Sequence, residues 1–171
     1  MYNKAFVYFI ALFLSLFSIF PNISLALNQE EYNSYAQNLA NGWIITYSTD
    51  YKINQFITRR EMLKVMINIS KDSINQNCKQ TFLDLPSSDW WCKYAQTALN
   101  LGYIANNQNF RPNDNVSKLE AIKMIFKAKK IEVSVSWNWQ EAYYQKALEL
   151  WIIQSFSDYN SNALRWFVFK T

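Results

Sequence analysis

The chain has 171 residues, half of them hydrophobic, and its 17 Lys and Arg outnumber 13 Asp and Glu to give a formal net charge of +4. It has no His, which excludes Ser-His-Asp and Cys-His nucleophile pairs, His-ligated metals and an imidazole pH switch. With two Cys and two Gly, an all-thiolate zinc site and a glycine-rich phosphate loop are also excluded. Soluble proteins contain about 7% Gly, so this chain is unusually poor in Gly, whereas it has seven Trp.

The N-terminal segment has the features of a secretory signal peptide. Lys4 supplies a positive charge, residues 5–20 form an apolar run, and Ser24 and Ala26 are small residues at the −3 and −1 positions of a cleavage site. We predict that residues 1–26 are removed, with an uncleaved membrane anchor as the alternative, and expect no membrane span in the mature chain. Export argues against nucleic acid as the partner of the basic charge. Anionic polymers of the cell envelope would be suitable partners for the basic charge. The alternative is that the charge has no specific partner and only keeps the protein soluble.

Cys78 and Cys92 are the two cysteines, and an even number in an exported chain favours a disulfide. Two free buried thiols are the alternative.

The sequence repeats itself. A shift of 59 residues places Tyr35-Ala36-Gln37 on Tyr94-Ala95-Gln96 without a gap, and a degenerate third copy follows 49 residues later. The predicted units cover residues 27–77, 78–130 and 131–171. The third is truncated, which suggests that the chain is a fragment of something longer.

Each unit has the pattern of a helix, an irregular loop and a second helix. In the second unit the apolar spacing predicts a first helix over about residues 88–101 and a loop with Pro112 over residues 105–115. Ser117-Lys118-Leu119-Glu120 forms a capping box for the second helix, and Thr58-Arg59-Arg60-Glu61 repeats it in the first unit. Because two helices cannot enclose a core, the three units are expected to stack their apolar faces into an all-α fold.

The second unit resembles an S-layer homology domain. The resemblance rests on Phe82-Leu83-Asp84-Leu85-Pro86, Trp90, Leu101-Gly102-Tyr103-Ile104, Asn109-Phe110-Arg111-Pro112-Asn113 and Ser117-Lys118-Leu119-Glu120. The first unit keeps Ile57-Thr58-Arg59-Arg60-Glu61, and the third keeps Trp139, Leu150-Trp151-Ile152-Ile153 and Arg165. The resemblance implies a pseudo-threefold helical module that is not an enzyme and needs no cofactor. Its implied partner is a secondary cell-wall polysaccharide or another anionic glycan linked to peptidoglycan. The implied location is the cell surface. Self-association in a surface layer is a further expectation.

Position by position, the resemblance implies a set of ligand contacts, namely Arg59, Lys118, Arg165, Trp90, Trp139 and Asp84. The match of Arg165 requires a short deletion in the third loop. An arginine at a helix start can grip a carboxylate or phosphate with two hydrogen bonds, whereas Lys118 lacks the planar fork. Each residue also has a structural alternative. Arg59 and Lys118 could be solvated cations beside a capping box, and Trp90 and Trp139 could belong to the core. Asp84 could cap the turn at residues 86–88.

Four tryptophans stand at unusual positions. Trp43 and Trp151 align with Gly102. The resemblance implies that the first helix ends at this position in a left-handed residue, a conformation that suits glycine. Trp166 stands where a small residue is usual, and Trp137 lies in a polar turn. One hypothesis is that UGA codons read as glycine by the source were translated as Trp. The alternative is that AT-biased coding lowered the Gly content and that the neighbouring Gly42 makes Trp43 tolerable.

The preferred interpretation is a non-catalytic anchor for cell-wall glycan, and an exported protein–protein interaction module on the same fold is the alternative. A hydrolase using Glu61 and Glu120 is disfavoured because capping boxes already account for both carboxylates. A helix-turn-helix nucleic-acid binder is disfavoured because no helix carries a dense basic face.

Overall fold

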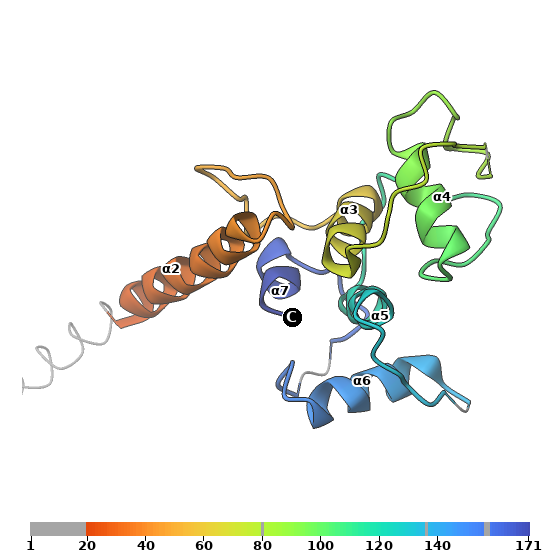
Figure 1. The fold of residues 1–171 in the computed structure, drawn as a ribbon. Helices are drawn as coiled ribbons and strands as arrows, with labels where there is room; N and C mark the ends of the chain where they lie inside the picture. The colour runs from red at the N-terminus through yellow and green to blue at the C-terminus, as the bar shows by residue number, and fades with distance from the viewer. Residues whose placement is uncertain (1–19, 80, 136, 156–157) are drawn as a thin grey trace, which may run out of the picture.

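A computed structural model describes residues 20–79, 81–135, 137–155 and 158–171, and within these ranges the chain is helical. Its helices are α2 (Phe20–Asn41), α3 (Arg59–Ser70), α4 (Cys92–Asn100), α5 (Lys118–Ala128), α6 (Trp139–Glu149) and α7 (Arg165–Lys170) (Figure 1). The described residues contain isolated β-bridges but no strand. The predicted all-α class is therefore confirmed.

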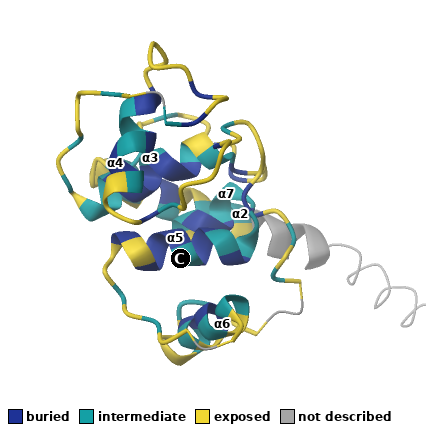
Figure 2. Cartoon of the chain, turned by 90° about the vertical axis from the view of Figure 1, so that its right-hand side faces the viewer, coloured by how far each residue is buried: buried dark blue, intermediate teal, exposed yellow. Residues whose placement is uncertain are grey.

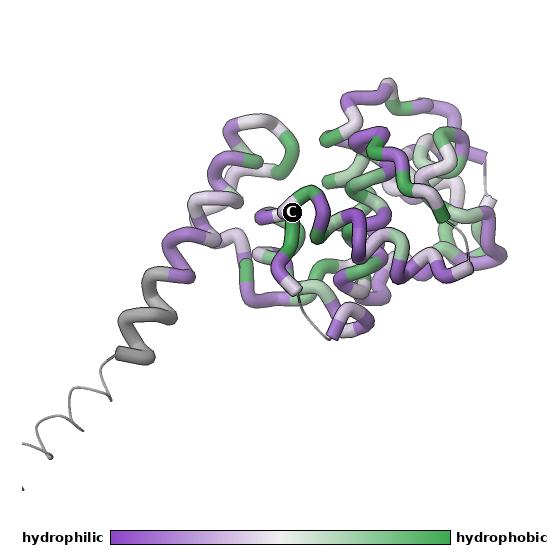
Figure 3. The backbone as a smooth tube through the Cα atoms, turned by 90° about the horizontal axis from the view of Figure 1, so that it is seen from below, coloured by the Kyte–Doolittle hydropathy of each residue, from purple (hydrophilic) through white to green (hydrophobic). Residues whose placement is uncertain are grey.

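Helix α5 lies at the centre of the fold. It packs against α3, α6 and α7, while α4 packs on α3 and α2 packs on α7, so the first and last helices lie side by side. Figure 2 shows buried residues concentrated in α3 and α5, whereas the connecting segments are mostly exposed. Figure 3 shows apolar and polar residues alternating along the helical tube, as expected for helices with one buried face.

The amphipathic pattern of α5 explains its central place. Leu119, Ile122 and Phe126 recur at helical spacing and are all fully buried. Each large apolar side chain that is buried in this way contributes about 1.5–3 kcal/mol. The predicted cap is present, because Ser117 Oγ accepts from the Glu120 amide at 3.2 Å and Glu120 Oε2 accepts from the Ser117 amide at 3.0 Å.

The first helix of the second unit is shorter than predicted. It begins at Cys92 rather than near residue 88, and it ends at Asn100. A turn precedes it, in which the Asp89 carboxylate accepts from the Trp91 amide at 2.9 Å and the Asp89 amide donates to the Pro86 carbonyl at 3.0 Å. This local side-chain bond competes with helix formation. The predicted loop at residues 105–115 is non-helical, as expected.

Most of the predicted signal peptide, residues 1–19, lies outside the described residues. Helix α2 runs from Phe20 through the predicted cleavage site at residues 24–26. Cleavage there stays a prediction. No helix within the described ranges has both the length and the apolar character needed to cross a membrane.

Three loops meet in a closed ring of backbone hydrogen bonds, one loop from each unit. Ile57 N donates to Ala163 O at 3.0 Å, Ala163 N to Val116 O at 2.7 Å, and Val116 N to Ile57 O at 3.1 Å. A second ring, two residues away along each loop, joins Arg59 N to Asp114 O, Lys118 N to Ser161 O and Arg165 N to Gln55 O. Each loop is thereby bonded to both of the others. The rings bring the starts of α3, α5 and α7 together, while a pseudo-threefold arrangement of whole units stays a prediction.

Two local predictions of the sequence are confirmed. Cys78 and Cys92 form a disulfide with a Cα–Cα distance of 5.7 Å. The three aligned helix ends are left-handed, with φ of 61° at Trp43, 71° at Gly102 and 57° at Trp151. Both tryptophan side chains extend into solvent and are 89% and 92% exposed, respectively. The left-handed position therefore carries backbone strain in two of the three units, and the exposed side chains offset little of it by packing.

Candidate functional site

Three grooves lie where the units meet, and they share a common plan. Each groove has an isoleucine that follows the first helix of one unit and a lysine from the second helix of that same unit. It also has a cation from the start of another unit's second helix. Groove 1 is lined by Ile45, Glu61, Lys64, Trp91 and Arg165. Groove 2 is lined by Ile104, Arg59, Glu120, Lys123 and Trp139. Groove 3 is lined by Tyr32, Ile153, Lys118, Phe167 and Lys170.

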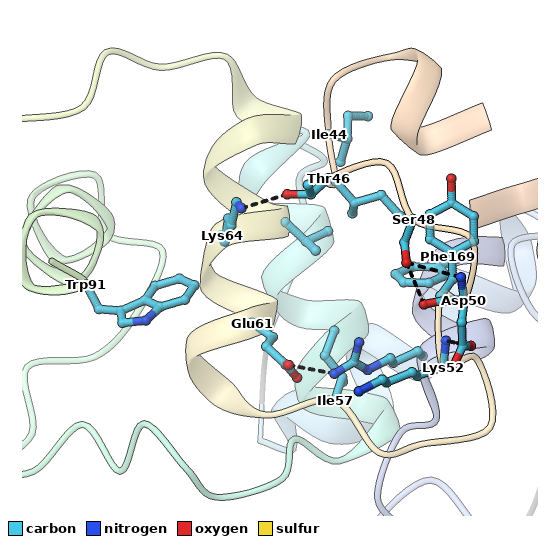
Figure 4. A pocket seen from close by; sticks show the side chains of 14 residues that line it. Ile44, Thr46, Ser48, Asp50, Lys52, Ile57, Glu61, Lys64, Trp91 and Phe169 are labelled. Atoms are coloured by element: carbon cyan, nitrogen blue, oxygen red, sulfur yellow. Dashed lines mark hydrogen bonds and ion pairs between the residues drawn. The ribbon is translucent and has the colours of Figure 1, made fainter. Parts of the chain in front are cut away.

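Groove 1 has a volume of about 400 Å³ and contains a tight ion pair (Figure 4). Arg165 Nη2 lies 2.6 Å from Glu61 Oε1, and Glu61 Oε2 accepts from the Thr58 amide at 3.0 Å. Lys64 donates to the Thr46 hydroxyl at 3.2 Å across the groove. The Glu61 carboxylate thus has a structural role in the cap and also neutralises the groove's guanidinium.

Groove 2 is smaller, about 200 Å³, and its cations are held inside the protein. Arg59 Nε donates to the Phe110 carbonyl at 2.8 Å, its guanidinium stacks over the Phe110 ring, and Nη1 lies 3.8 Å from Glu120 Oε1. Burial lowers the pKa of Arg59, which nevertheless stays protonated at neutral pH. Lys123 Nζ lies 4.2 Å from the centroid of the Trp139 ring, a cation–π contact, and burial lowers the pKa of this lysine.

Groove 3 has a volume of about 390 Å³ and a different charge pattern. Phe167 stands two residues after Arg165, at the position that Glu61 and Glu120 occupy in the other units. Lys118 Nζ lies 4.0 Å from Asp158 Oδ2, whose side chain is largely exposed. Trp166 stacks on Tyr32 at a centroid distance of 4.5 Å and thereby connects α7 to α2.

The three cations implied by the resemblance all line grooves, one in each. Arg165 lines groove 1, Arg59 groove 2 and Lys118 groove 3. The second backbone ring places these three residues in equivalent positions, because the amide of each donates to the next loop. The residues from Gly102 to Lys118 number two more than those from Trp151 to Arg165, so the third loop has the short deletion that the alignment required.

The two predicted tryptophans have different surroundings. Trp139 lines groove 2, whereas Trp90 lines none of the three grooves. Trp90 is 56% exposed and its ring lies 3.8 Å from that of Trp91. It is the neighbouring Trp91 that lines groove 1 and points towards α3 (Figure 4).

Asp84 supports the loop beside groove 2. Its carboxylate oxygens accept from the amides of Phe110 at 2.7 Å and Arg111 at 2.6 Å. Arg111 has a left-handed φ of 59° and lines groove 2. The carboxylate therefore holds the backbone that supports the groove, rather than capping the turn at residues 86–88.

We expect Asp84→Ala to lower the free energy of unfolding by about 1 kcal/mol, because two charge-assisted hydrogen bonds at an exposed site are lost. Chemical denaturation measures this change. The matched control is Asp114→Ala, which removes only an exposed pair to Arg111 with a 3.5 Å separation and is expected to change stability by less than about 0.5 kcal/mol. Equal losses in both variants would contradict the supporting role of Asp84.

The lysines of the grooves were missed as site residues by sequence reasoning. Lys64, Lys123 and Lys170 each stand three residues after Glu61, Glu120 and Phe167, respectively, and each lines a groove. A signal was present, because Lys64 and Lys123 align in the 59-residue shift. No group of His, Cys, Asp or Glu within the described ranges is arranged to hold a metal ion.

Comparison with known proteins finds a family match within the second unit. Residues 81–122 match the S-layer homology domain. The chain is also similar to the middle cell wall protein of Brevibacillus brevis (strain 47 / JCM 6285 / NBRC 100599), with 28% identity over 128 residues that cover 71% of this chain. The chain spans 12% of the length of that relative. The matched segment contains Asp84, the left-handed Gly102, the loop held by Asp84 and the capping box at Ser117, so this part of the chain is similar to that domain.

Proposed function

We propose that the chain is a non-catalytic module that binds an anionic cell-wall glycan in grooves 1 to 3 and so attaches to the cell surface. The carrying observation is that all three grooves present a cation from the start of a second helix. The S-layer homology match and the cell-wall relative support a role at the wall. The disulfide supports an exported location, since such bonds persist in oxidising environments.

The proposed contacts follow from the chemistry of each side chain. Arg165 and Arg59 offer guanidinium groups to a carboxylate or phosphate, and Lys118 offers an ammonium group in the third groove. Trp139 provides an aromatic wall beside Lys123 in groove 2. Asp84 is proposed to act indirectly through Arg111, and Trp90 is proposed as a more peripheral aromatic contact outside the grooves.

The carboxylates of the grooves support a binding role rather than catalysis. Glu61 accepts from the Thr58 amide and pairs with Arg165, and Glu120 accepts from the Ser117 amide. Both carboxylates are therefore already engaged by groups of the fold itself. A glycoside hydrolase needs one carboxyl group free to donate a proton to the leaving oxygen.

The test is co-sedimentation of the purified protein with purified cell walls that carry their secondary polymer. We expect retention on these walls, release by about 1 M salt because ionic contacts are screened, and loss of retention after the polymer is removed chemically. Retention that survives polymer removal would contradict the proposal. Retention that instead disappears when wall-bound proteins are digested with protease would support the protein–protein interaction module.

A further inference from the structure

We propose that a cavity inside the first unit binds an uncharged saccharide unit beside groove 1. This inference rests on the proposed function and deepens it, because it adds a subsite for a neutral sugar to a glycan-binding module. The cavity has a volume of about 690 Å³ and lies between the end of α2, the segment that follows it and α3. We call it the first-unit cavity, and the residues that carry the argument are Asn41, Trp43, Thr46, Tyr47, Lys64 and Asn68.

Two exposed aromatic side chains line the first-unit cavity. Trp43 is 89% exposed and Tyr47 is 68% exposed. The face of a pyranose ring presents C–H groups, which pack on the electron-rich face of an aromatic ring. The hydroxyl groups at the edge of the sugar are then left for polar partners. Two open aromatic rings in one concave surface therefore suit a saccharide.

The backbone of Trp43 supports a role for its side chain. The residue has a left-handed φ of 61°, a conformation that disfavours any side chain. The exposed indole offsets little of this cost by packing within the fold. Backbone strain that the fold itself does not use is typical of binding sites, where a side chain must be presented in a particular direction.

The other two units lack the second aromatic ring. Tyr47 aligns with Asn106 in the second unit and with Ser155 in the third. Trp151 is left-handed and exposed like Trp43, but it has no aromatic residue at the position equivalent to Tyr47. The neutral subsite is therefore assigned to the first unit alone.

Two side-chain amides supply polar partners for sugar hydroxyls. Gln37 Nε2 donates to Asn41 Oδ1 at 3.0 Å, and Asn68 Nδ2 donates to the Ile44 carbonyl at 2.7 Å. These bonds hold both amides in place and leave Asn41 Nδ2 to donate and Asn68 Oδ1 to accept. A sugar hydroxyl both donates and accepts, so it matches this pair.

The first-unit cavity is continuous with groove 1. Lys64 and Thr46 line both spaces, and Lys64 Nζ donates to the Thr46 hydroxyl at 3.2 Å (Figure 4). Lys64 is the one charged side chain among the described residues that line the cavity. A single cation that already has a partner favours an uncharged sugar over an acidic one. The site therefore suits the neutral unit that adjoins an acidic unit held in groove 1.

The indole N–H of Trp43 reports directly on occupation of the first-unit cavity. We expect neutral N-acetylglucosamine, N-acetylmannosamine or glucose to shift this signal in an NMR titration, with the signal assigned by Trp43→Phe. Trp137 is the control, because it is 99% exposed but lines neither this cavity nor any of the three grooves. Equal shifts at both tryptophans would show non-selective contact with exposed indoles, and no shift of Trp43 with any of the three sugars would show that the cavity binds none. Either result overturns the assignment.

Aromatic variants provide a second measurement, followed through the side-chain amide signals of Asn41. Tyr47→Ala and Trp43→Gly should each weaken binding of the effective sugar about five-fold, the order expected for loss of one aromatic contact. Tyr47→Phe keeps the ring and should change the affinity less than about two-fold, as should Trp137→Gly. Because Trp43→Gly also relieves left-handed strain, a variant that is more stable yet binds more weakly separates a binding role from a structural one. Equal affinities of Tyr47→Ala and Tyr47→Phe would contradict the role of the ring.

Failure of this inference is distinguishable from failure of the proposed function. If polymer-bearing walls retain the protein but the neutral sugars leave the Trp43 signal in place, the neutral subsite is wrong while wall binding stands. A UGA codon for residue 43 that the source reads as glycine would likewise remove the subsite alone. If the protein does not sediment with polymer-bearing walls at all, the proposed function itself is wrong.

Discussion

Replacing Trp43 and Trp151 together with glycine is expected to raise the free energy of unfolding by about 2 kcal/mol. A side chain in the left-handed region costs about 1–2 kcal/mol at each position. Glycine is more flexible in the unfolded chain, which reduces the gain in stability by about 0.5–1 kcal/mol at each position. The two indoles are almost fully exposed, so their removal sacrifices little packing. Urea denaturation of the printed sequence and of the double variant measures the difference.

Two controls separate backbone strain from the loss of a tryptophan. Trp137→Gly removes a side chain that is 99% exposed and does not stand at one of the three aligned helix ends, so it should give no comparable gain in stability. Gly102→Ala places a Cβ atom at a φ of 71° where no neighbour lies within 4 Å, so any destabilisation reports the backbone alone. A double variant that is no more stable than the parent would show that the left-handed tryptophans are not strained.

The same positions bear on how the gene is read. The left-handed φ of Trp43 and Trp151 is what the hypothesis of UGA read as glycine requires at these two sites. Trp166 has no positive φ and stacks on Tyr32, so its environment does not call for glycine. Sequencing the codons for residues 43, 137, 151 and 166 tests the hypothesis, and UGG at all four would exclude recoding.

Loss of the disulfide is expected to destabilise the protein by about 3 kcal/mol, the chain-entropy value for a loop of about 15 residues. Cys78 and Cys92 are 14 positions apart, and Cys92 is the first residue of α4. The bond therefore ties the start of the second unit to a helix that packs on α3. Comparing the parent with Cys78→Ser/Cys92→Ser by urea denaturation gives the change.

Reducing agent provides the control for this prediction. Dithiothreitol should lower the stability of the parent towards that of the double serine variant, and it should leave the variant unchanged. A parent that is equally stable with and without reductant would indicate that the loop is already ordered without the bond.

Much of the fold could be predicted from local sequence signals. The capping box at Ser117 and the left-handed ends at Trp43, Gly102 and Trp151 were predicted correctly, because each depends on a few neighbouring residues. The start of α4 was predicted wrongly, since the periodic apolar pattern continues into a turn held by the Asp89 side chain. Periodicity identifies a helical face, but it does not reveal a competing side-chain bond outside the helix.

The candidate site could also be predicted only in part from the sequence. The family resemblance placed Arg59, Lys118 and Arg165 among the candidate contacts, because they stand at matching positions beside the helix starts. It did not find that Phe167 distinguishes groove 3, since each groove combines residues from different units, such as Arg165 with Glu61, which are 104 positions apart. Such pairs depend on how the units pack and not on the spacing within any one unit.

The sequence alone determined the deficit of glycine, the absence of histidine and the catalytic classes that these exclude. It also determined the repeat that aligns Trp43 and Trp151 with Gly102. Only the tertiary structure decided that the three loops close into hydrogen-bonded rings and that the grooves carry different charge patterns. The physical reason is range. Backbone conformation and helix capping are set by neighbours within a few residues, whereas the field inside a groove is the sum of charges that folding brings together from distant parts of the chain.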